Sequence, residues 1–297
     1  MKLVFTGGSG FIGQNLLKSF DNTHGVSLRS SDWENELKEA DVIINLVGKA
    51  HNHKGIATEQ DFRFANIELT KQIFNEFIKS KANLLIYVSS IASVEEFESF
   101  RLLDEEMPCN PFSFYGKTKR EAEKWLLAQE LPVGKKLIIL RPPMVHGEGD
   151  KGSLKLLYNL ISNGMPYPLS NFNNKRSFVS IDNFVYFIRK IIENYPKIES
   201  GIYHIADDEM ITTKQIIEII ESVERKKVLN LKVPKFLIYS IAKIGDVVPI
   251  PLNTTRLKKM TGTLLVSNQK IKSALGIEKL PLSAKEGLEK TIRSFKR

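Results

Sequence analysis

The chain has a single cysteine, Cys109, among its 297 residues, so it holds no internal disulfide. A chain this poor in cysteine is typical of a reducing compartment. It has no uninterrupted run of about 18 apolar residues, the length that a membrane-spanning helix needs. The apolar start, residues 1–5, is also far shorter than a signal peptide. These absences predict a cytoplasmic protein without a membrane span.

Nucleic-acid and metal motifs are missing as well. No helix-turn-helix pattern, zinc spacing or aromatic–basic interleaving is present, so we expect no nucleic-acid partner. His51 and His53 are close in sequence but lack a third ligand at a suitable spacing, so we expect no metal. Cys109, between two prolines, is expected to be a turn residue, and His146 a packing residue.

Positive charge is concentrated at one end of the chain. Residues 222–297 hold 17 Lys+Arg against 5 Asp+Glu, a net charge of +12, and the remainder holds 26 against 29, a net charge of −3. An anionic small molecule or an anionic membrane surface are the partners such a segment suits, although most of these lysines are expected to be solvated. The apolar stretch 235–252 lies within this segment and is expected to pack under a small lobe; weak docking on an anionic membrane is the sharper alternative.

The first two thirds of the chain alternate apolar β-type runs with segments of helical period. This order predicts an α/β fold in which helices wrap a parallel sheet. We expect residues 1–150 to bind a dinucleotide, residues 176–206 to return partly to that domain, and residues 151–175 and 207–297 to form a smaller substrate-binding lobe. The expected strands are 2–5, 26–29, 41–47, 84–89, 137–140 and 202–205; the expected helices are 12–20, 62–80, 113–131, 182–194, 213–224 and 235–245.

A glycine-rich turn follows the first expected strand. In Thr-Gly-Gly-Ser-Gly-Phe-Ile-Gly, Gly7 permits a tight turn, Gly10 lets backbone approach a pyrophosphate, and Gly13 lets helix and strand pack closely. The helix that begins here offers free N–H groups to phosphates. The position of the motif between strand and helix predicts a doubly wound, Rossmann-type dinucleotide site that also includes Ser9, Phe11 and Ile12.

The end of the second strand bears on the choice of coenzyme. An acidic residue there would hold the adenosine ribose of NAD, but the chain has Arg29 and Ser30, which suit a 2′-phosphate. NADP(H) is therefore favoured, and NAD(H) remains possible. Asp32 is expected near the adenine amino group, with Trp33 beside it, and no helix is expected between the second and third strands.

Tyr115 and Lys119 are four residues apart on the helix 113–131, so they lie on one helical face. An ammonium near a phenol lowers the pKa of the phenol and makes it an effective acid–base catalyst. Ser89 and Ser90 end a parallel strand, at the edge of the sheet where such folds bind ligands. We expect Ser90 to hydrogen-bond the reacting oxygen.

In these motifs, the chain resembles the extended short-chain dehydrogenase/reductase superfamily over nearly its whole length. The glycine turn resembles that superfamily's nucleotide fingerprint, Tyr-Gly-Lys-Thr-Lys its catalytic motif, and Val-Ser-Ser-Ile its serine strand, whose second serine is catalytic in UDP-galactose 4-epimerases. The resemblance implies Ser90, Tyr115 and Lys119 as catalytic residues and a possible homodimer formed through the catalytic helix. It implies cofactor contacts from Leu46, Val47, Gly48, Asn66, Tyr115, Lys119, Pro142 and Val145, and substrate contacts from Ser90, Arg176 and Arg256.

Within this superfamily the chain is similar to a bacterial polysaccharide-biosynthesis subgroup of 4-epimerases and 4-ketoreductases. The resemblance implies reduction of the 4-keto group of a UDP-linked 6-deoxy-hexosamine, or else 4-epimerisation of a UDP-sugar with NAD. A 4,6-dehydratase is disfavoured, because Ser90-Ile91-Ala92 stands where dehydratases have Thr-Asp-Glu. A regulatory nucleotide sensor on the same fold is disfavoured by the intact Ser–Tyr–Lys set.

Overall fold

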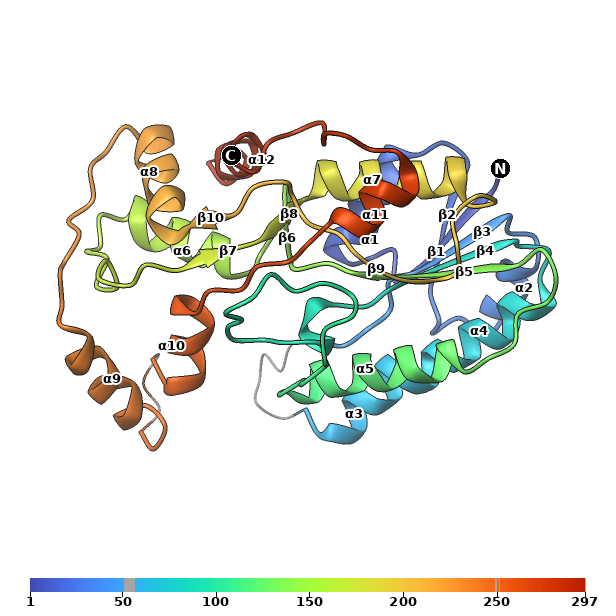
Figure 1. The fold of residues 1–297 in the computed structure, drawn as a ribbon, viewed down its shortest axis with the longest axis horizontal. Coiled ribbons are helices and arrows are strands. Elements are labelled where there is room, and N and C mark those ends of the chain that lie inside the picture. The colour runs from blue at the N-terminus through green and yellow to red at the C-terminus, as the bar shows by residue number, and fades with distance from the viewer. Residues whose placement is uncertain (51–56, 249, 251, 297) are drawn as a thin grey trace.

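The computed structural model describes residues 1–50, 57–248, 250 and 252–296. Six parallel strands form its main sheet in the order β2-β1-β3-β4-β5-β9, with helices on both faces (Figure 1). This is the expected α/β, Rossmann-type architecture. The strands are β1 (Leu3–Thr6), β2 (Thr23–Val26), β3 (Val42–Asn45), β4 (Leu84–Val88), β5 (Lys136–Arg141) and β9 (Gly201–His204).

The inner strands β1, β3 and β4 are almost wholly apolar and fully buried because both faces of the sheet are covered, whereas the edge strand β2 is partly exposed. Neighbouring residues point to opposite sides: Phe5 and Ile44 enter one core, whereas Val4 and Ile43 enter the other. The first core is covered by α1 (Phe11–Ser19), α7 (Ile181–Asn194) and α11 (Gln269–Leu275). The second is covered by α2 (Trp33–Lys38), α4 (Leu69–Lys79) and α5 (Phe114–Leu127).

Three segments differ from the sequence prediction. Strand β2 ends at Val26, three residues before the expected end, so Arg29 follows the strand. A short helix, α2, does lie between β2 and β3, because Trp33 and Leu37 are one turn apart and both bury into the core. The expected helix 62–80 begins as α3 (Glu59–Arg63), widens into a π-helical turn at Phe64–Glu68 and continues as α4.

The remaining elements form a lobe beside the carboxyl edge of the sheet, at the left of Figure 1. Its own core joins α6, α8 and α12 with apolar residues of α9 and α10. The elements are β6 (Met144–His146), α6 (Ser153–Ser162), β7 (Lys175–Arg176), β8 (Phe178–Ser180), β10 (Ile211–Thr212), α8 (Thr213–Glu224), α9 (Lys235–Ile244), α10 (Thr254–Thr261) and α12 (Ala284–Ser294). The 3₁₀ turn Ile91–Ser93 follows β4 and packs against α5.

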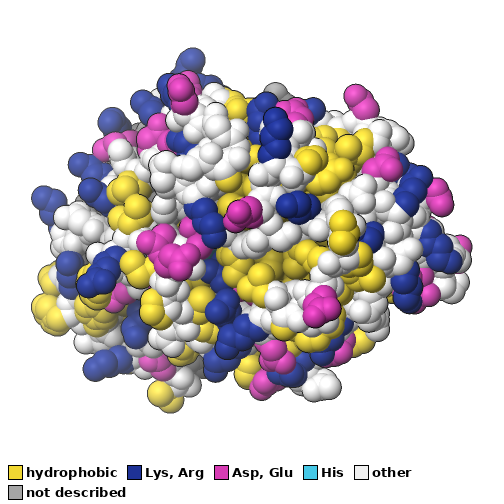
Figure 2. Space-filling model, turned by 45° about the vertical axis from the view of Figure 1, so that its right-hand side comes forward, with side chains coloured by type: hydrophobic (Ala, Val, Ile, Leu, Met, Phe, Trp, Pro, Cys, Tyr) yellow, Lys and Arg dark blue, Asp and Glu magenta, His cyan; other side chains and the backbone are white. Residues whose placement is uncertain are grey.

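The two parts of the chain are interleaved. Residues of the C-terminal segment, Ile271, Ile277 and Leu280, join the first core of the sheet. The division at residues 150, 176 and 206 stays a prediction, to which the structure adds this return of residues 269–280. Over the face drawn in Figure 2, Lys and Arg side chains alternate with acidic ones and with apolar patches. Among the described residues, every helix is too short or too polar to cross a bilayer.

Candidate active site

The glycine turn after β1 is as tight as its sequence predicts. Gly7 has a φ of +76°, a conformation that favours glycine. A Cβ on Gly13 would lie 2.6 Å from Cα of Gly8 and 2.7 Å from the carbonyl oxygen of Gly7, so only glycine lets α1 approach the turn this closely. At the start of α1, Gly10 is the N-cap and provides no side-chain hydrogen bond. The first N–H groups of α1 therefore remain available to an anion, which fits the diphosphate of a dinucleotide.

The residues expected around the adenosine lie after β2. Arg29 and Ser30 are exposed in the turn that follows the strand, and Asp32 is the exposed N-cap of α2. The side chain of Trp33 is only 8% exposed and belongs to the second core, so it contributes to packing. The turn after β2 therefore carries the guanidinium of Arg29 and the hydroxyl of Ser30, and both side chains are exposed to solvent.

The segment after β3 connects the glycine turn to the catalytic helix. A Cβ on Gly7 would lie 3.0 Å from the backbone of both Leu46 and Val47. A Cβ on Gly48 would lie 2.9 Å from Oδ1 of Asn66 and 3.0 Å from Nζ of Lys119. The dinucleotide turn, the third strand and the lysine are therefore contiguous.

Asn66 fixes this junction from inside the π-helical turn. It is fully buried, its Oδ1 accepts from the N–H of Lys49 at 2.7 Å, and its Nδ2 donates to the carbonyl of Lys49 at 3.2 Å. The same Nδ2 donates to Oγ1 of Thr118, on the catalytic helix, at 2.8 Å. The side chain of Asn66 therefore holds the loop after β3 against α5 and satisfies both backbone polar groups of Lys49.

The two serines that end β4 have different surroundings. Ser89 is 3% exposed and donates to Oε1 of Glu123 at 2.5 Å. Ser93 donates to the same oxygen at 2.8 Å, and Arg141 forms a buried ion pair with Glu123 at 2.7 Å. The hydroxyl of Ser90 does not contact Glu123; it is partly accessible and accepts from the N–H of Ala92 at 3.2 Å. Of the two serines, Ser90 is the one available to a ligand.

Sequence reasoning missed Glu123. Its carboxylate is completely buried, and the hydrogen bonds and charge of Arg141 lower its pKa against the opposing effect of burial. The signal was present, because Lys119, Ala122, Glu123 and Leu126 all lie on the inward face of α5. An acid at i+4 from a lysine on a buried helical face indicates an internal polar network.

Tyr115 and Lys119 meet Ser90 on the inner face of α5. The hydroxyl of Ser90 hydrogen-bonds the phenol of Tyr115. Lys119 is 3% exposed, donates to the carbonyl of Val88 at 2.9 Å and lies 4.7 Å from the ring centroid of Tyr87. Gly116 permits the close approach, since a Cβ there would lie 2.3 Å from the carbonyl oxygen of Ala92.

The electrostatics differ from the sequence-based expectation. Desolvation raises the pKa of Tyr115, and the hydrogen bond with Ser90 opposes that rise. The expected lowering of the phenol's pKa by Lys119 is wrong for this arrangement, because the lysine is directed at the Val88 carbonyl. Burial also lowers the pKa of Lys119 to about 8. The phenol of Tyr115 therefore stays protonated at neutral pH, and Lys119 loses its charge only in mildly alkaline solution.

The segment after β5 closes the nicotinamide end of the predicted site. Pro142 is buried and its carbonyl accepts from the N–H of Ile91 at 2.9 Å, which joins this segment to the serine strand. Val145 is partly buried against the first core, on β6. Both therefore border the carboxyl edge of the sheet.

The two arginines expected at the substrate lie in the lobe. Nη1 of Arg176 donates to the carbonyls of Lys259 at 2.9 Å and Gly262 at 3.1 Å, and burial lowers its pKa to about 10. Arg256 is exposed on α10, the helix whose end Arg176 holds. Their contact with a diphosphate stays a prediction.

The other residues singled out in the sequence are away from this chemistry. His146 is buried and its Nδ1 pairs with Oγ1 of Thr291 at 2.9 Å, while burial lowers its pKa to about 4. Cys109 is partly buried near Arg141, whose Nη2 lies 3.7 Å from its sulfur. His51 and His53 lie outside the described residues. Elsewhere in the described chain, no three or more His, Cys, Asp or Glu side chains are grouped to hold a metal.

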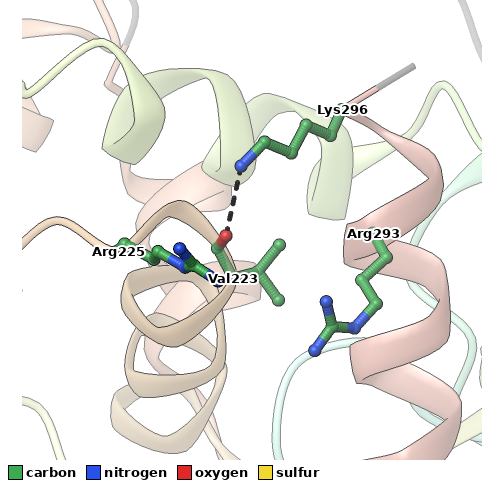
Figure 3. A pocket seen from close by; sticks show the side chains of 4 residues that line it. All are labelled: Val223, Arg225, Arg293 and Lys296. Carbon is green, nitrogen blue, oxygen red and sulfur yellow. Dashed lines mark hydrogen bonds between the residues drawn. The ribbon is translucent and has the colours of Figure 1, made fainter.

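A hollow of about 420 Å³ lies outside the active site, between α8 and α12 (Figure 3). Val223, Arg225, Arg293 and Lys296 line it, and Nζ of Lys296 donates to the carbonyl of Val223 at 3.3 Å. Arg225 and Lys296 lie at the carboxyl end of α8, where positive charge stabilises a helix. The negative end of the α8 dipole accounts for the positive charge at this hollow. Its lining residues include no nucleophile and no acid–base pair.

A doubly wound sheet with a glycine turn at its carboxyl edge, and a serine, a tyrosine and a lysine beside that turn, define an NAD(P)-dependent enzyme. The family comparison agrees. Residues 3–206 match the NAD dependent epimerase/dehydratase family, and the chain belongs to that family.

Similar proteins of known name and structure cover most of the chain. A UDP-glucose 4-epimerase of Vibrio cholerae is 28% identical over 99% of this chain and 95% of its own. A UDP-2-acetamido-2,6-beta-L-arabino-hexul-4-ose reductase of Pseudomonas aeruginosa is 26% identical over 65% of this chain and 50% of its own. The crystal structure of UDP-glucuronic acid 4-epimerase from Bacillus cereus with NAD has a TM-score of 0.78, at 18% identity, and covers 100% of this chain and 99% of its own.

Proposed function

We propose that this protein is a nucleotide-sugar 4-ketoreductase, which uses NAD(P)H to reduce the 4-keto group of a UDP-linked 6-deoxy-hexosamine. The observation that carries the proposal is the meeting of Ser90, Tyr115 and Lys119 beside the glycine turn. The similar proteins named above, an epimerase and a reductase, both bear names that refer to position 4 of a UDP-linked sugar.

The chemistry requires one hydride and one proton. The reduced nicotinamide supplies the hydride to the carbonyl carbon. Tyr115 gives its phenolic proton to the carbonyl oxygen, and the resulting phenolate regains a proton from solvent. Ser90 hydrogen-bonds the phenol and orients the same oxygen. Lys119, whose ammonium donates to the carbonyl of Val88 and lies beside Gly48, would hold the nicotinamide ribose.

A second candidate is an NAD-dependent UDP-sugar 4-epimerase with the same three residues, a class to which similar proteins are assigned by name. Epimerisation begins with removal of a proton from the sugar hydroxyl, so Tyr115 would first act as a base. Desolvation raises the pKa of Tyr115 and keeps its proton in place. An epimerase therefore needs the phenol's pKa lowered before this first step, whereas a reductase uses the protonated phenol directly.

NADP(H) is the favoured coenzyme in this proposal. Arg29 and Ser30 occupy the exposed turn after β2, where a 2′-phosphate would receive a charge-assisted bond. Asp32 would accept from the adenine amino group, and Arg176 with Arg256 would bind the UDP diphosphate. Replacing Arg29 by Ala is expected to raise KM for NADPH by about tenfold while leaving KM for NADH unchanged. Equal effects on both coenzymes would contradict the assignment.

The direct test is absorbance at the nicotinamide band with UDP-4-keto-6-deoxy-HexNAc and either coenzyme. A reductase consumes one reduced coenzyme for each sugar. Tyr115→Phe is expected to lower kcat by about 10²–10⁴-fold, whereas Tyr239→Phe, an exposed tyrosine on α9, leaves it unchanged. Coenzyme binding, followed by fluorescence, shows that the variant is folded.

The epimerase is tested in parallel. UDP-glucose and UDP-GlcNAc are incubated with the protein as purified, and the products are separated by their C4 configuration. Formation of the C4 epimer without added coenzyme, together with no coenzyme consumption on the 4-keto sugar, would replace the reductase by the epimerase.

A further inference from the structure

Helix α9 (Lys235–Ile244) has an apolar face that the protein does not cover. Its contact with the lobe is made by Ile238 and Ala242, which are 3% and 0% exposed and lie one turn apart. The opposite side of a helix is about half a turn away, two residues before or after each of these positions. That side carries Phe236 and Ile244 with Ser240 between them, so it is more apolar than the outer face of an ordinary surface helix.

The outward side chains are strongly exposed. Phe236 is 67% exposed, Ile244 56%, and Val247, just beyond the helix, 88%. Leu237, Ile241 and Val248 extend the same surface, each at least 43% exposed. Helix α9 lies at the margin of the molecule, beside α10 and far from the six-stranded sheet (Figure 1). A contiguous apolar surface in such a position is typical of an interaction site.

Positive charge surrounds this surface. Residues 226–262 hold eight Lys+Arg and one acidic residue, a net charge of +7. The acidic residue, Asp246, is engaged within the fold, where its Oδ1 accepts from the N–H of Thr254 at 3.0 Å and from its hydroxyl at 2.9 Å. All eight lysines and arginines of this segment are exposed; Lys235 and Lys243 lie on α9, and Arg256, Lys258 and Lys259 lie on α10, where Lys259 pairs with Glu96 at 3.2 Å.

The charge decides between the possible occupants. A second copy of the chain packed through α9 would place the same +7 segment against itself, which repulsion disfavours. An anionic lipid surface satisfies both features at once, since it accepts apolar side chains below the headgroups and attracts the lysines at their level.

We propose that the surface of α9 and residues 245–248 docks this enzyme on anionic phospholipid membranes. Phe236, Ile241, Ile244 and Val247 enter the headgroup–acyl boundary, and Lys235 and Lys243, on the flanks of the helix, contact lipid phosphates. The binding is peripheral and reversible, and it places the enzyme at the membrane surface. This inference does not depend on which sugar the active site accepts.

The test is flotation of the full-length protein with vesicles, without substrate. Vesicles that contain phosphatidylglycerol should carry the protein at low salt and release it at high salt, and pure phosphatidylcholine vesicles should not. Phe236→Ser with Ile244→Ser should lower binding by at least tenfold. Lys235→Gln with Lys243→Gln should lower it about 25-fold, since each lysine near an anionic surface contributes about fivefold.

Matched controls come from exposed apolar residues elsewhere. Phe100→Ser with Val133→Ser, which alters side chains 97% and 106% exposed, should leave vesicle binding unchanged. The α9 variants should keep full turnover of a soluble substrate, so a failure of docking and a failure of the proposed reaction are read in separate assays. No flotation at low salt, equal binding to neutral vesicles, or a dimer that the α9 variants dissociate would each overturn the proposal.

Discussion

At the scale of single residues, two adjacent serines have separate tasks. Ser89 is bound into the buried Glu123–Arg141 pair, and Ser90 hydrogen-bonds Tyr115. Both serines follow β4, and because the backbone of Ser90 is still extended, the two successive side chains point to opposite sides.

We therefore expect Ser90→Ala and Ser89→Ala to have contrasting effects. Ser90→Ala should lower kcat/KM by about 10²-fold, as loss of a group that binds the reacting oxygen does, without lowering stability. Ser89→Ala should lower the free energy of unfolding by about 1–3 kcal/mol, because a buried carboxylate loses a donor, and should leave kcat within about threefold. Steady-state kinetics and urea denaturation of both variants check this; identical profiles would contradict it.

The pH dependence of the reaction should reflect Lys119. Its pKa of about 8 means that the side chain is charged below that pH and neutral above it. If the charged ammonium holds the nicotinamide ribose, kcat/KM falls as pH rises through about 8 and is constant below it. The profile of Lys117→Gln, an exposed neighbour on α5, should be the same as that of the unaltered protein. A kcat/KM that stays constant up to pH ~10 would exclude this role.

Residue types and spacing were sufficient to predict Ser90, Tyr115, Lys119 and the glycine turn as candidates. They were not sufficient for the sign of the pKa shift of Tyr115, which depends on burial and on the direction of the Lys119 side chain. The spacing of four residues between Tyr115 and Lys119 predicts neither the burial of the phenol nor the direction of the lysine side chain.

At the scale of elements, the position of α5 depends on one glycine. A Cβ on Gly116 would lie 2.3 Å from the carbonyl oxygen of Ala92 and 2.6 Å from Oε1 of Glu96. The carbonyl of Ala92 belongs to the backbone of the 3₁₀ turn that follows Ser90 and cannot rotate away. A side chain at position 116 would therefore push α5 away from that turn.

Gly116→Ala should therefore lower kcat by about 10-fold or more through displacement of Tyr115 from Ser90, since small misplacements of catalytic groups are costly. Alanine favours helix by about 1 kcal/mol over glycine, so local helix propensity would act in the opposite direction. Lys117→Ala on the same helix is the control. A fully active Gly116→Ala enzyme would show that this close contact does not set the catalytic geometry.

The strands of the parallel sheet and the helices α1, α4, α5, α7, α8 and α9 followed from the sequence, because runs such as Leu84–Val88 must be buried on both faces. The short elements did not. In α2 two apolar side chains, Trp33 and Leu37, are all that mark a helix of six residues. The π-helical turn at Phe64–Glu68 follows from the hydrogen bonds of Asn66 to Lys49 and Thr118, partners 17 and 52 residues distant.

At the scale of the whole molecule, the C-terminal segment completes the core of the N-terminal domain. Ile271 of α11 is fully buried in the first core, with Ile277 and Leu280. Sequence could not show this return, because α11 is only seven residues long and its partners lie in α7 and β9.

Ile271→Ala should accordingly destabilise the dinucleotide-binding part by about 2–5 kcal/mol, the usual cost of such a truncation in a core. The loss should appear in denaturation monitored by coenzyme binding as well as by circular dichroism. Lys270→Ala, at the adjacent exposed position, is the control. If the variant is destabilised by circular dichroism but its coenzyme-binding transition stays at the same denaturant concentration, the C-terminal segment and the coenzyme-binding part unfold independently.

The guanidinium of Arg176 joins three stretches of chain through the carbonyls of Phe97, Lys259 and Gly262. An anion that binds Nη1 of Arg176 must displace the carbonyls at the end of α10. Anion binding and the packing of α10 therefore compete for the same guanidinium nitrogen. Because such linkage is reciprocal, whatever shifts α10 must change the affinity for the anion by the same factor. Arg176 alone would then couple the position of α10 to the binding of an anion at its guanidinium.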